Sequence, residues 1–411
     1  PTSLLITGFD ILFFWVARMI MLGCHFMADH PQGSVPFKEV YIHALVRDAD
    51  RQKMSKTKGN VLDPIEVTEK FGTDAVRFTL ASMASPGTDI AFSESRTDGY
   101  RAFANKIWNA ARFMFMHLDR VGGVSITGGE PKDAQNNLEY RWILSRLNHV
   151  AGTVNQSLTE YRFDEAANTV YSFFWGEFCD WYLEIIKPRL TGSETEARSA
   201  LAFLGYVFEA ALRLLSPFMP FITEEIWHAM YEGKPPSKSI SLTRYPQCDP
   251  AELNNEAEEQ MALLQELIVN IRNLRAELKV ETKEKTGVRI HAGADIEKLV
   301  NENRSMLERL ANVEGIQFVP ESLAKEKVSR ATARFEVTLI YEQKIDIAAE
   351  TERLTKELKK NQTLLAAAEA RLTNEQFLSK APPHVVEGLK KQVEELRIVI
   401  QKLQRRLDEL K

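Results

Sequence analysis

The last run of the chain repeats an apolar residue at every third or fourth position, and this period restricts the possible folds more than any other feature. The repeat comprises Leu389, Val393, Leu396, Ile400, Leu403, Leu407 and Leu410. Such heptad spacing draws one apolar seam along a helix that packs against a second helix. A similar seam, at Leu354, Leu358, Leu365 and Leu372, precedes two prolines in "KAPPHV". Because proline cannot continue a helix, residues 346–411 are predicted to fold back as an antiparallel coiled-coil hairpin.

The middle of the chain has the pattern of a helical bundle. Amphipathic stretches such as "YRAFANKIWNAARFMFMHL" and "FDEAANTVYSFFWGEFCDWYLEII" fill residues 98–245 and predict an antiparallel all-α bundle. The proline-containing segment at 233–250 is predicted to be a linker. Residues 246–345 then contain one helical pattern, at 256–279, followed by alternating strand and helix patterns. This second part is predicted to be a small α+β module.

The start of the chain has an α/β pattern. Strands are expected at Ser3–Ile6 and in "VYIHALV", with a helix between them from about Ile11 to Leu22, which predicts a parallel sheet. The intervening apolar run is long enough to suggest a membrane span. However, Asp10 and Arg18 would each cost about 2.5–3.5 kcal/mol near a bilayer centre. A buried core element, with no membrane partner, is therefore predicted.

Composition and cysteine usage limit the class of protein. The chain has 411 residues, 44% of them apolar and 27% charged, which is enough for several domains with separate cores. Its three cysteines, Cys24, Cys179 and Cys248, form no C-x-x-C pair, so neither a disulfide framework nor a zinc site is expected. A reducing, cytoplasmic setting is predicted. Because an apolar run follows Pro1 almost directly, the chain is expected to be a fragment cut within a domain.

A basic loop, "RQKMSKTKGN", stands out in a chain of net charge −5. Met54 could anchor it in a core, and Gly59 and Asn60 can adopt left-handed backbone angles. Flexible ammonium groups beside a hydroxyl suit a polyphosphate ligand. On charge alone, a merely solvated loop remains the alternative.

The segment "KMSKT" at 53–57 resembles the KMSKS signature of class I aminoacyl-tRNA synthetases, with Thr57 in place of the serine. The adjoining "GNVLDP", together with "TGFDILFFWVARMIMLG", "NKIWNAARF", "DWYLEIIKPRL" and "LLSPFMPFITEEIW", resembles valyl-tRNA synthetases. This resemblance implies ATP-dependent activation of valine and its transfer to tRNA(Val). It also implies magnesium as the counter-ion of ATP, no tightly bound metal, and a monomer.

The resemblance assigns roles to residues at matching positions. Lys56 would contact the ATP phosphates, with Lys53 and Ser55 completing the loop. Asp10, Ile11 and Trp15 would line the valine pocket. His43 could lie near the adenosine, because ligands of open α/β sheets bind at the carboxyl ends of the strands. From the residues alone, Trp15 is better explained as a core aromatic, Asp10 as a helix N-cap and His43 as a structural strand residue.

One signature of the family is missing. None of the eight histidines lies in an H-x-G-H pattern, which marks the first half of the class I catalytic site. Residues 1–62 would therefore be the second half of a Rossmann-like nucleotide fold. The editing domain of the family would also lie upstream of Pro1. We expect this polypeptide alone neither to activate valine nor to edit.

The remaining segments would face tRNA. The resemblance implies a stem-contact helical segment at 63–97 and an anticodon-binding bundle at 98–245, where Arg112 and Phe113 could stack on unpaired bases. Residues 350–411 carry 13 basic and 10 acidic residues, a net charge of +3, which leaves −8 for the preceding residues. The heptads alone favour a dimerising coiled coil, but a basic hairpin suits an RNA backbone. Its candidate RNA contacts are Lys359, Lys360, Arg371, Lys390 and Lys391.

Two alternative classes of protein remain. An isoleucyl or leucyl relative would share the loop, but isoleucyl enzymes usually carry C-terminal zinc-ligating cysteines and leucyl enzymes lack the C-terminal arm. A noncatalytic tRNA-binding or coiled-coil scaffold protein would need the helical parts alone. Activity with ATP and valine distinguishes the scaffold from the ligase.

Overall fold

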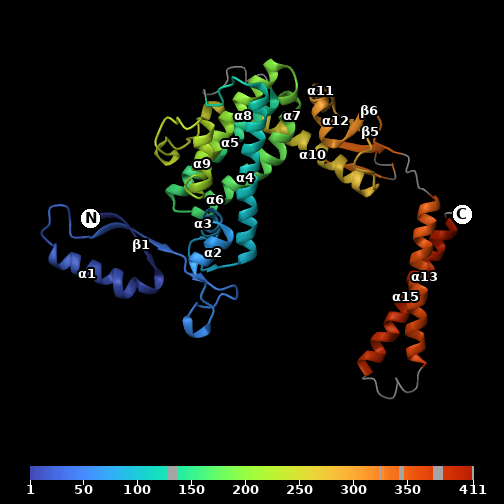
Figure 1. Cartoon of the computed structure of the whole chain (residues 1–411), viewed down its shortest axis with the longest axis horizontal. Helices are drawn as coiled ribbons and strands as arrows, with labels where there is room; N and C mark the ends of the chain where they lie inside the picture. Colours follow the sequence, from blue (N-terminus) through green and yellow to red (C-terminus); the bar gives the residue numbers. More distant parts are fainter. Residues whose placement is uncertain (128–136, 324–325, 327, 342–346, 374–382, 410–411) are drawn as a thin grey trace. The chain divides into compact units, whose positions relative to one another are not determined.

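The structure is a computed structural model that describes residues 1–127, 137–323, 326, 328–341, 347–373 and 383–409 (Figure 1). The chain divides into two compact units. One comprises Pro1–Asn273 and Val288–Thr338, and the other comprises Leu274–Gly287 and Leu339–Lys411.

The N-terminal segment is a parallel strand–helix–strand unit. Strands β1 (Thr2–Gly8) and β2 (Phe37–His43) pair in parallel, with Gly8 opposite His43. A 3-10 turn at Phe9–Ile11, a π-helical turn at Leu12–Val16 and helix α1 (Ala17–Phe26) connect them. The predicted parallel pairing is confirmed. The second predicted strand is divided, because β2 ends at His43 and a separate β3 (Val46–Arg47) pairs with β4 (Ile90–Ala91).

The apolar run of this segment is not buried, contrary to prediction. Phe9–Phe26 is long and apolar enough to cross a membrane by length and composition, yet only 6% of it is buried. Phe13 is 81% exposed and Phe26 is 73% exposed. Two strands and one helix offer too little surface to enclose these side chains, so the apolar pattern has no core of its own here.

Two short helices follow the basic loop. Asp63 caps α2 (Pro64–Phe71), since its Oδ1 accepts a hydrogen bond from the backbone N–H of Ile65 at 2.8 Å. Pro64 occupies the first helical position, where its missing N–H costs nothing. The helix ends at Gly72, whose φ of +88° favours glycine. Helix α3 (Thr73–Ser82) begins directly afterwards.

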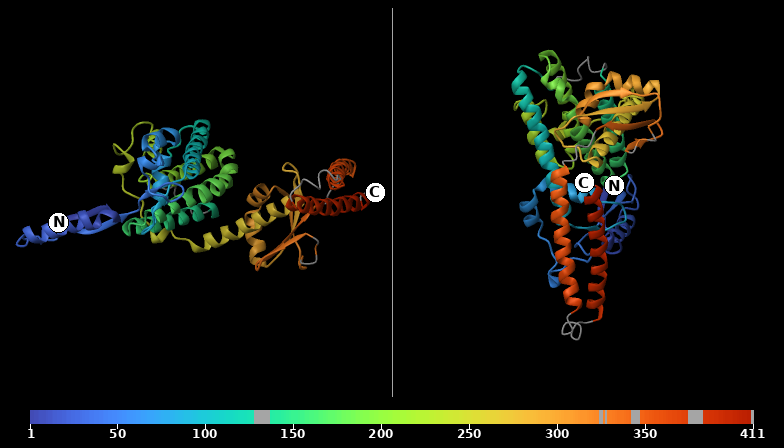
Figure 2. Two further views of the ribbon diagram at one scale, coloured as in Figure 1. Left: turned by 90° about the horizontal axis from the view of Figure 1, so that it is seen from below. Right: turned by 90° about the vertical axis from the view of Figure 1, so that its right-hand side faces the viewer.

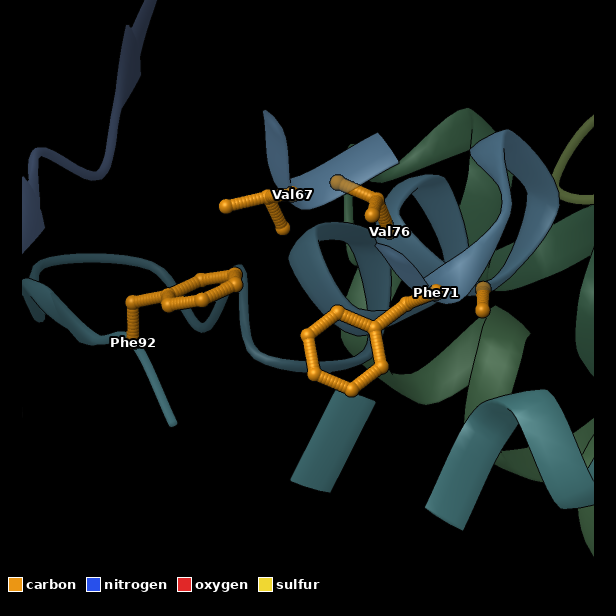
Figure 3. Close-up of a cluster of buried hydrophobic side chains, with 5 residues drawn as sticks. Val67, Phe71, Val76 and Phe92 are labelled. Atoms are coloured by element: carbon orange, nitrogen blue, oxygen red, sulfur yellow. The ribbon is translucent and has the colours of Figure 1, made fainter. Parts of the chain in front are cut away.

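A cluster of buried apolar side chains joins these helices. Val67 and Phe71 come from α2, and Ala75 and Val76 come from α3. Phe92, which directly follows β4, completes the cluster (Figure 3). The single glycine between the two helices lets their apolar side chains meet in one cluster.

The bundle predicted from the helical periodicity is confirmed. It contains α4 (Glu94–Val121), α5 (Leu138–Thr159), α6 (Phe163–Ser172), a π-helical segment (Phe173–Tyr182), α7 (Leu183–Thr191), α8 (Glu194–Leu215) and α9 (Pro220–Met230). Its core is aromatic, with Phe178 and Phe208 stacked at 5.7 Å between ring centroids. Phe78 of α3 is also fully buried and lies 5.4 Å from Phe103 of α4. The helices after the loop thus share one core with the bundle.

A long helix, α10 (Asn255–Glu277), leads into the α+β module. The module contains β5 (Thr286–Ala292), α11 (Ala294–Glu302), α12 (Arg304–Ala311), β6 (Val313–Phe318), β7 (Ser329–Ala331) and β8 (Phe335–Ile340). Its sheet has the strand order β6-β5-β8-β7. Arg146 of α5 holds the start of α10 by donating to Glu258 at 3.0 Å and to Glu177 at 2.7 Å.

The C-terminal residues form the predicted helical hairpin. Helices α13 (Ile347–Leu372) and α15 (Pro383–Glu409) pack along each other, as Figure 2 shows. Ala368, Val393 and Ile400 are buried between them, and Arg397 pairs with Glu369 at 2.7 Å. The predicted seam is therefore confirmed where side chains are described. The side chains of Leu354, Leu403, Leu407 and Leu410 lie outside the described residues.

Candidate functional site

The basic loop has a defined backbone. Residues Lys56–Lys58 form one 3-10 turn, which Ser55 caps by accepting from the backbone N–H of Lys58 at 3.3 Å. Gly59 ends the turn at φ +68°, in the left-handed region. A side chain at this position would strain the backbone, so the glycine is needed for the conformation.

The loop is anchored by one apolar side chain. Met54 is half-buried and packs against the cluster of Val67, Phe71, Ala75, Val76 and Phe92. Lys53 and Lys56 on either side of it are exposed, and within the described residues no salt bridge includes either ammonium group. This arrangement presents two positive charges from a fixed backbone, as a polyphosphate site requires.

A second group of candidates lies at the carboxyl ends of the two parallel strands. Gly8 ends β1, and a Cβ built on it would lie 2.8 Å from Asp10 Oδ1 and 3.6 Å from His43 Cε1. Asp10 and His43 therefore meet at Gly8, and both are exposed. His43 Nδ1 lies 2.9 Å from the backbone oxygen of Ala44, to which it can donate a hydrogen bond.

The structure rules out two alternative explanations of this group. Asp10 lies within the 3-10 turn and caps no helix, since Gly8 is the N-cap. Trp15 is 44% exposed and Ile11 is 40% exposed, so neither is a core residue of this chain. Gly8 was not among the predicted site residues. Its signal was a glycine placed directly after a predicted strand in an α/β pattern.

Arg112 and Phe113 of α4 line two different grooves. Phe113 lines a groove of about 190 Å³ together with Lys106, Leu183 and Lys187. The ammonium group of Lys187 lies 5.8 Å from the Phe113 ring, and the ring of His117 lies 4.7 Å away. Arg112 is exposed beside a separate groove of about 70 Å³ that Trp108 also lines.

Each lysine of the Phe113 groove has a carboxylate partner, since Lys187 pairs with Glu184 and Lys106 pairs with Asp180 at 2.7 Å. Burial lowers the pKa of His117, and the nearby cations Arg120 and Lys187 lower it further. His117 therefore stays neutral at neutral pH while the lysines carry the charge. Lys187 comes from α7, far along the chain, so no local pattern linked it to Phe113.

The five cations of the hairpin that are candidates for RNA contact lie on its exposed surface. All five candidates of the hairpin are exposed, and no salt bridge within the described residues includes them: Lys359, Lys360, Arg371, Lys390 and Lys391. In the described part of the chain, no group of three or more His, Cys, Asp or Glu side chains is arranged to hold a metal ion.

Three family descriptions match successive parts of the chain. Residues 1–93 match "tRNA synthetases class I (I, L, M and V)". Residues 140–290 match "Anticodon-binding domain of tRNA ligase", and residues 346–411 match "Valyl tRNA synthetase tRNA binding arm". The third description separates this chain from the isoleucyl and leucyl alternatives.

Curated relatives are similar over nearly the whole chain. The valine–tRNA ligase of Solibacter usitatus is 44% identical over 390 residues, covering 95% of this chain and 43% of the relative. That of Nitratidesulfovibrio vulgaris is 42% identical, covering 96% and 44%, and that of Aquifex aeolicus is 39% identical, covering 98% and 35%. The chain thus spans less than half the length of these relatives. It belongs to the valine–tRNA ligase family of class I aminoacyl-tRNA synthetases, of which it represents the C-terminal portion.

Proposed function

We propose that this chain provides a valine–tRNA ligase with its ATP-phosphate loop, part of its valine pocket and its tRNA-binding surfaces. The whole reaction would be the ATP-dependent activation of valine followed by transfer to tRNA(Val). The observation that carries the proposal is the anchored loop at 53–57, which presents two ammonium groups without a carboxylate partner in the described structure.

Lys56 is the residue assigned to the phosphates of ATP, assisted by Lys53 and Ser55. During activation, negative charge grows on the departing pyrophosphate. An ammonium group held nearby binds that charge more strongly in the transition state than in the ground state, which lowers the barrier. Magnesium would accompany ATP as its counter-ion, and no tightly bound metal is proposed.

Valine would bind at the carboxyl ends of β1 and β2. The Asp10 carboxylate can accept hydrogen bonds from the ammonium group of the amino acid, and Ile11 and Trp15 offer exposed apolar surface to its branched side chain. Gly8 leaves the space between Asp10 and His43 open. Ligands of open α/β sheets bind at this edge, so His43 is assigned to the adenosine side.

The exposed apolar run provides the contact with the rest of the catalytic domain. Phe13, Phe14, Met21 and Phe26 are each at least 65% exposed, which is too much contiguous apolar surface for a finished domain. We infer that residues 1–62 complete a Rossmann-like nucleotide fold against the part of the relatives that this chain does not span. By this account the chain alone is inactive in activation and editing.

The other segments are assigned to tRNA. Residues 63–97 would contact the tRNA stem side, 98–245 the anticodon and 346–411 the tRNA body, with 246–345 as the junction between them. Exposed cations that form no salt bridge within the described residues support the hairpin as an RNA-binding surface rather than a dimer seam. A cytoplasmic monomer with tRNA(Val), valine and ATP as its partners fits these assignments.

The test is Lys56→Ala in the chain joined to the remainder of its catalytic domain, measured by valine-dependent ATP–pyrophosphate exchange. Loss of one electrostatic contact to the transition state should lower kcat about 100-fold. Lys70→Ala is the matched control, because Lys70 pairs with Glu94 at 2.6 Å on the surface of α2. Equal rates for Lys56→Ala and the parent would refute the role of the loop.

A second candidate function applies to the chain without that remainder. The hairpin retains its exposed cations and the bundle retains the groove around Phe113, so tRNA binding without catalysis is expected. Filter binding of tRNA(Val) to the 411-residue chain tests it.

A further inference from the structure

One carboxylate closes the base of the ATP-phosphate loop. Asp48 Oδ1 accepts from the backbone N–H of Gln52 at 2.6 Å and from that of Asp50 at 3.1 Å. Its Oδ2 accepts from Asn60 Nδ2 at 2.7 Å. Asp48 thus binds the first turn of the loop and its last residue at the same time, across twelve positions of sequence.

The Asn60 amide reaches into the loop from that contact. Its Oδ1 accepts from the backbone N–H of Ser55 at 2.9 Å, and its Nδ2 also approaches the backbone oxygen of Lys53 at 3.3 Å. The orientation of the amide follows from its partners, since the N–H of Ser55 needs an acceptor and the carboxylate of Asp48 needs a donor. Asn60 therefore holds the backbone on both sides of Met54.

These contacts complement the apolar anchor. Met54 packs its side chain on the buried cluster, while Asn60 holds the peptide groups next to it. The backbone that bears Lys53 and Lys56 is thereby ordered before any ligand arrives, and only the lysine side chains remain to be immobilised. Hydrogen bonds from Asn60 and then from the Gln52 backbone lower the pKa of Asp48, so it remains an ionised acceptor at neutral pH.

We propose that Asp48, acting through Asn60, is a positioning residue of the ATP site, which holds the loop in the form that presents Lys53 and Lys56 to the phosphates. This role rests on the proposed function of the loop. We call the pair Asp48–Asn60 the clip. The clip needs one acceptor that faces one donor, and which of the two positions carries the acceptor matters less.

An exchange of the two side chains tests the clip. In Asp48→Asn two amides meet, and in Asn60→Asp two carboxylates meet. When both substitutions are combined, the new amide at position 48 donates to the new carboxylate at position 60. That carboxylate can still accept from the N–H of Ser55, and the amide oxygen at position 48 can still accept from the N–H of Gln52. The contact of Asn60 Nδ2 with the backbone oxygen of Lys53 is lost, because a carboxylate has no proton to donate.

Asp50→Asn is the control for the clip variants. It removes one charge from the same turn, and the Asp50 carboxylate accepts no hydrogen bond within the described residues. Any effect that this variant shares with Asp48→Asn would come from the change in charge rather than from the broken contact.

Two readouts are needed. Hydrogen exchange of the Ser55 amide, measured in the 411-residue chain, should become about tenfold faster in each single variant and return most of the way to the parent rate in the double variant. In the chain joined to the remainder of the catalytic domain, kcat for ATP–pyrophosphate exchange should fall about tenfold in each single variant, since small misplacements of reacting groups cost up to about 100-fold. The KM for ATP should change less than about threefold, and the double variant should recover most of kcat.

The outcomes separate the two proposals. If Lys56→Ala lowers kcat but the single clip variants match Asp50→Asn in both readouts, the clip is refuted and the loop stands. If the double variant is no better than the single ones, complementarity is refuted. If Lys56→Ala leaves kcat unchanged, the proposed function fails and the positioning role fails with it.

Discussion

Asp74 of α3 caps the first turn of α9 by accepting from the backbone N–H of Ile222 at 2.7 Å. Its other carboxylate oxygen accepts from the N–H of Phe221 at 3.2 Å. The residue is 9% exposed, and Arg77 of the same helix donates to the backbone oxygen of Pro217. These contacts join the helix pair behind the basic loop to the bundle through one buried carboxylate.

The Asp74 contact predicts a pH-dependent stability. Burial raises the pKa of Asp74 above its ordinary value, although both backbone hydrogen bonds oppose the rise. A carboxyl group whose folded-state pKa exceeds its unfolded-state pKa binds protons more tightly when folded. The contribution of Asp74 to the free energy of unfolding is therefore fully present below about pH 3.9, the pKa of an aspartate in the unfolded chain. This contribution is lost as pH rises from there through the higher pKa of the folded state.

Asp74→Ala measures this contribution. Loss of the cap should lower the free energy of unfolding by about 1–2 kcal/mol. Asp74→Asn should remove the pH dependence, so the stability difference between the parent and Asp74→Asn should shrink as pH rises through that window. Urea unfolding at several pH values gives both quantities, and a difference that grows with pH would contradict the assignment.

The close packing around Gly205 of α8 predicts that a side chain at this position destabilises the fold. A Cβ at this position would lie 2.5 Å from both the Cβ and the backbone oxygen of Ile126. Gly205→Ala should therefore lower the free energy of unfolding by about 1–3 kcal/mol, despite the better helix propensity of alanine. Gly99→Ala in α4, where nothing lies within 4 Å of the added Cβ, should instead stabilise by about 0.5–1 kcal/mol. Equal effects at both sites would refute the packing of Ile126 against α8.

The groove around Phe113 predicts a loss of tRNA affinity. If Phe113 stacks on an unpaired base beside Lys187, Phe113→Ala should weaken binding of tRNA(Val) about tenfold, within the range of about 1–3 kcal/mol per stacked base. Phe221→Ala on α9, an aromatic residue that is 64% exposed, is the control. Direct titration with labelled tRNA measures both, and unchanged affinity for Phe113→Ala would remove this groove from the anticodon surface.

The hairpin predicts the salt dependence of binding. The test variant replaces five exposed cations by glutamine: Lys359, Lys360, Arg371, Lys390 and Lys391. The slope of log affinity for tRNA against log salt concentration should become smaller by about 0.7–0.9 for each phosphate that the hairpin no longer neutralises. Lys298→Gln on α11, where Lys298 pairs with Glu302 at 3.8 Å, should leave the slope unchanged. An unaltered slope together with a smaller sedimenting species would favour a dimer seam instead.

Periodic and capping patterns predicted the local structure well because each of them depends on residues that are close in the sequence. The Asp63–Pro64 start of α2, the Gly72 stop, the Met54 anchor and the heptad seam all have short-range signals. Exposure could not be predicted in the same way. Phe13 and Trp15 have the pattern of core residues, yet both are exposed, because burial depends on the partner surface and not on the pattern.

Contacts between distant segments also left no signal. Arg146 and Glu258 are 112 positions apart, and Lys187 meets Phe113 only because α7 packs beside α4. The clip between Asp48 and Asn60 spans a shorter distance, but an aspartate and an asparagine in a polar loop are typical of any turn. The roles of these residues could be assigned only from the structure.

We propose that this chain holds one half of a valine-activating site. The most direct test is valine-dependent ATP–pyrophosphate exchange, measured for the 411-residue chain alone and for the chain joined to the remainder of its catalytic domain. We predict exchange only in the joined protein and its loss in the Lys56→Ala variant of that protein. Exchange by the chain alone would contradict the account, and so would a joined protein that activates isoleucine or leucine in preference to valine.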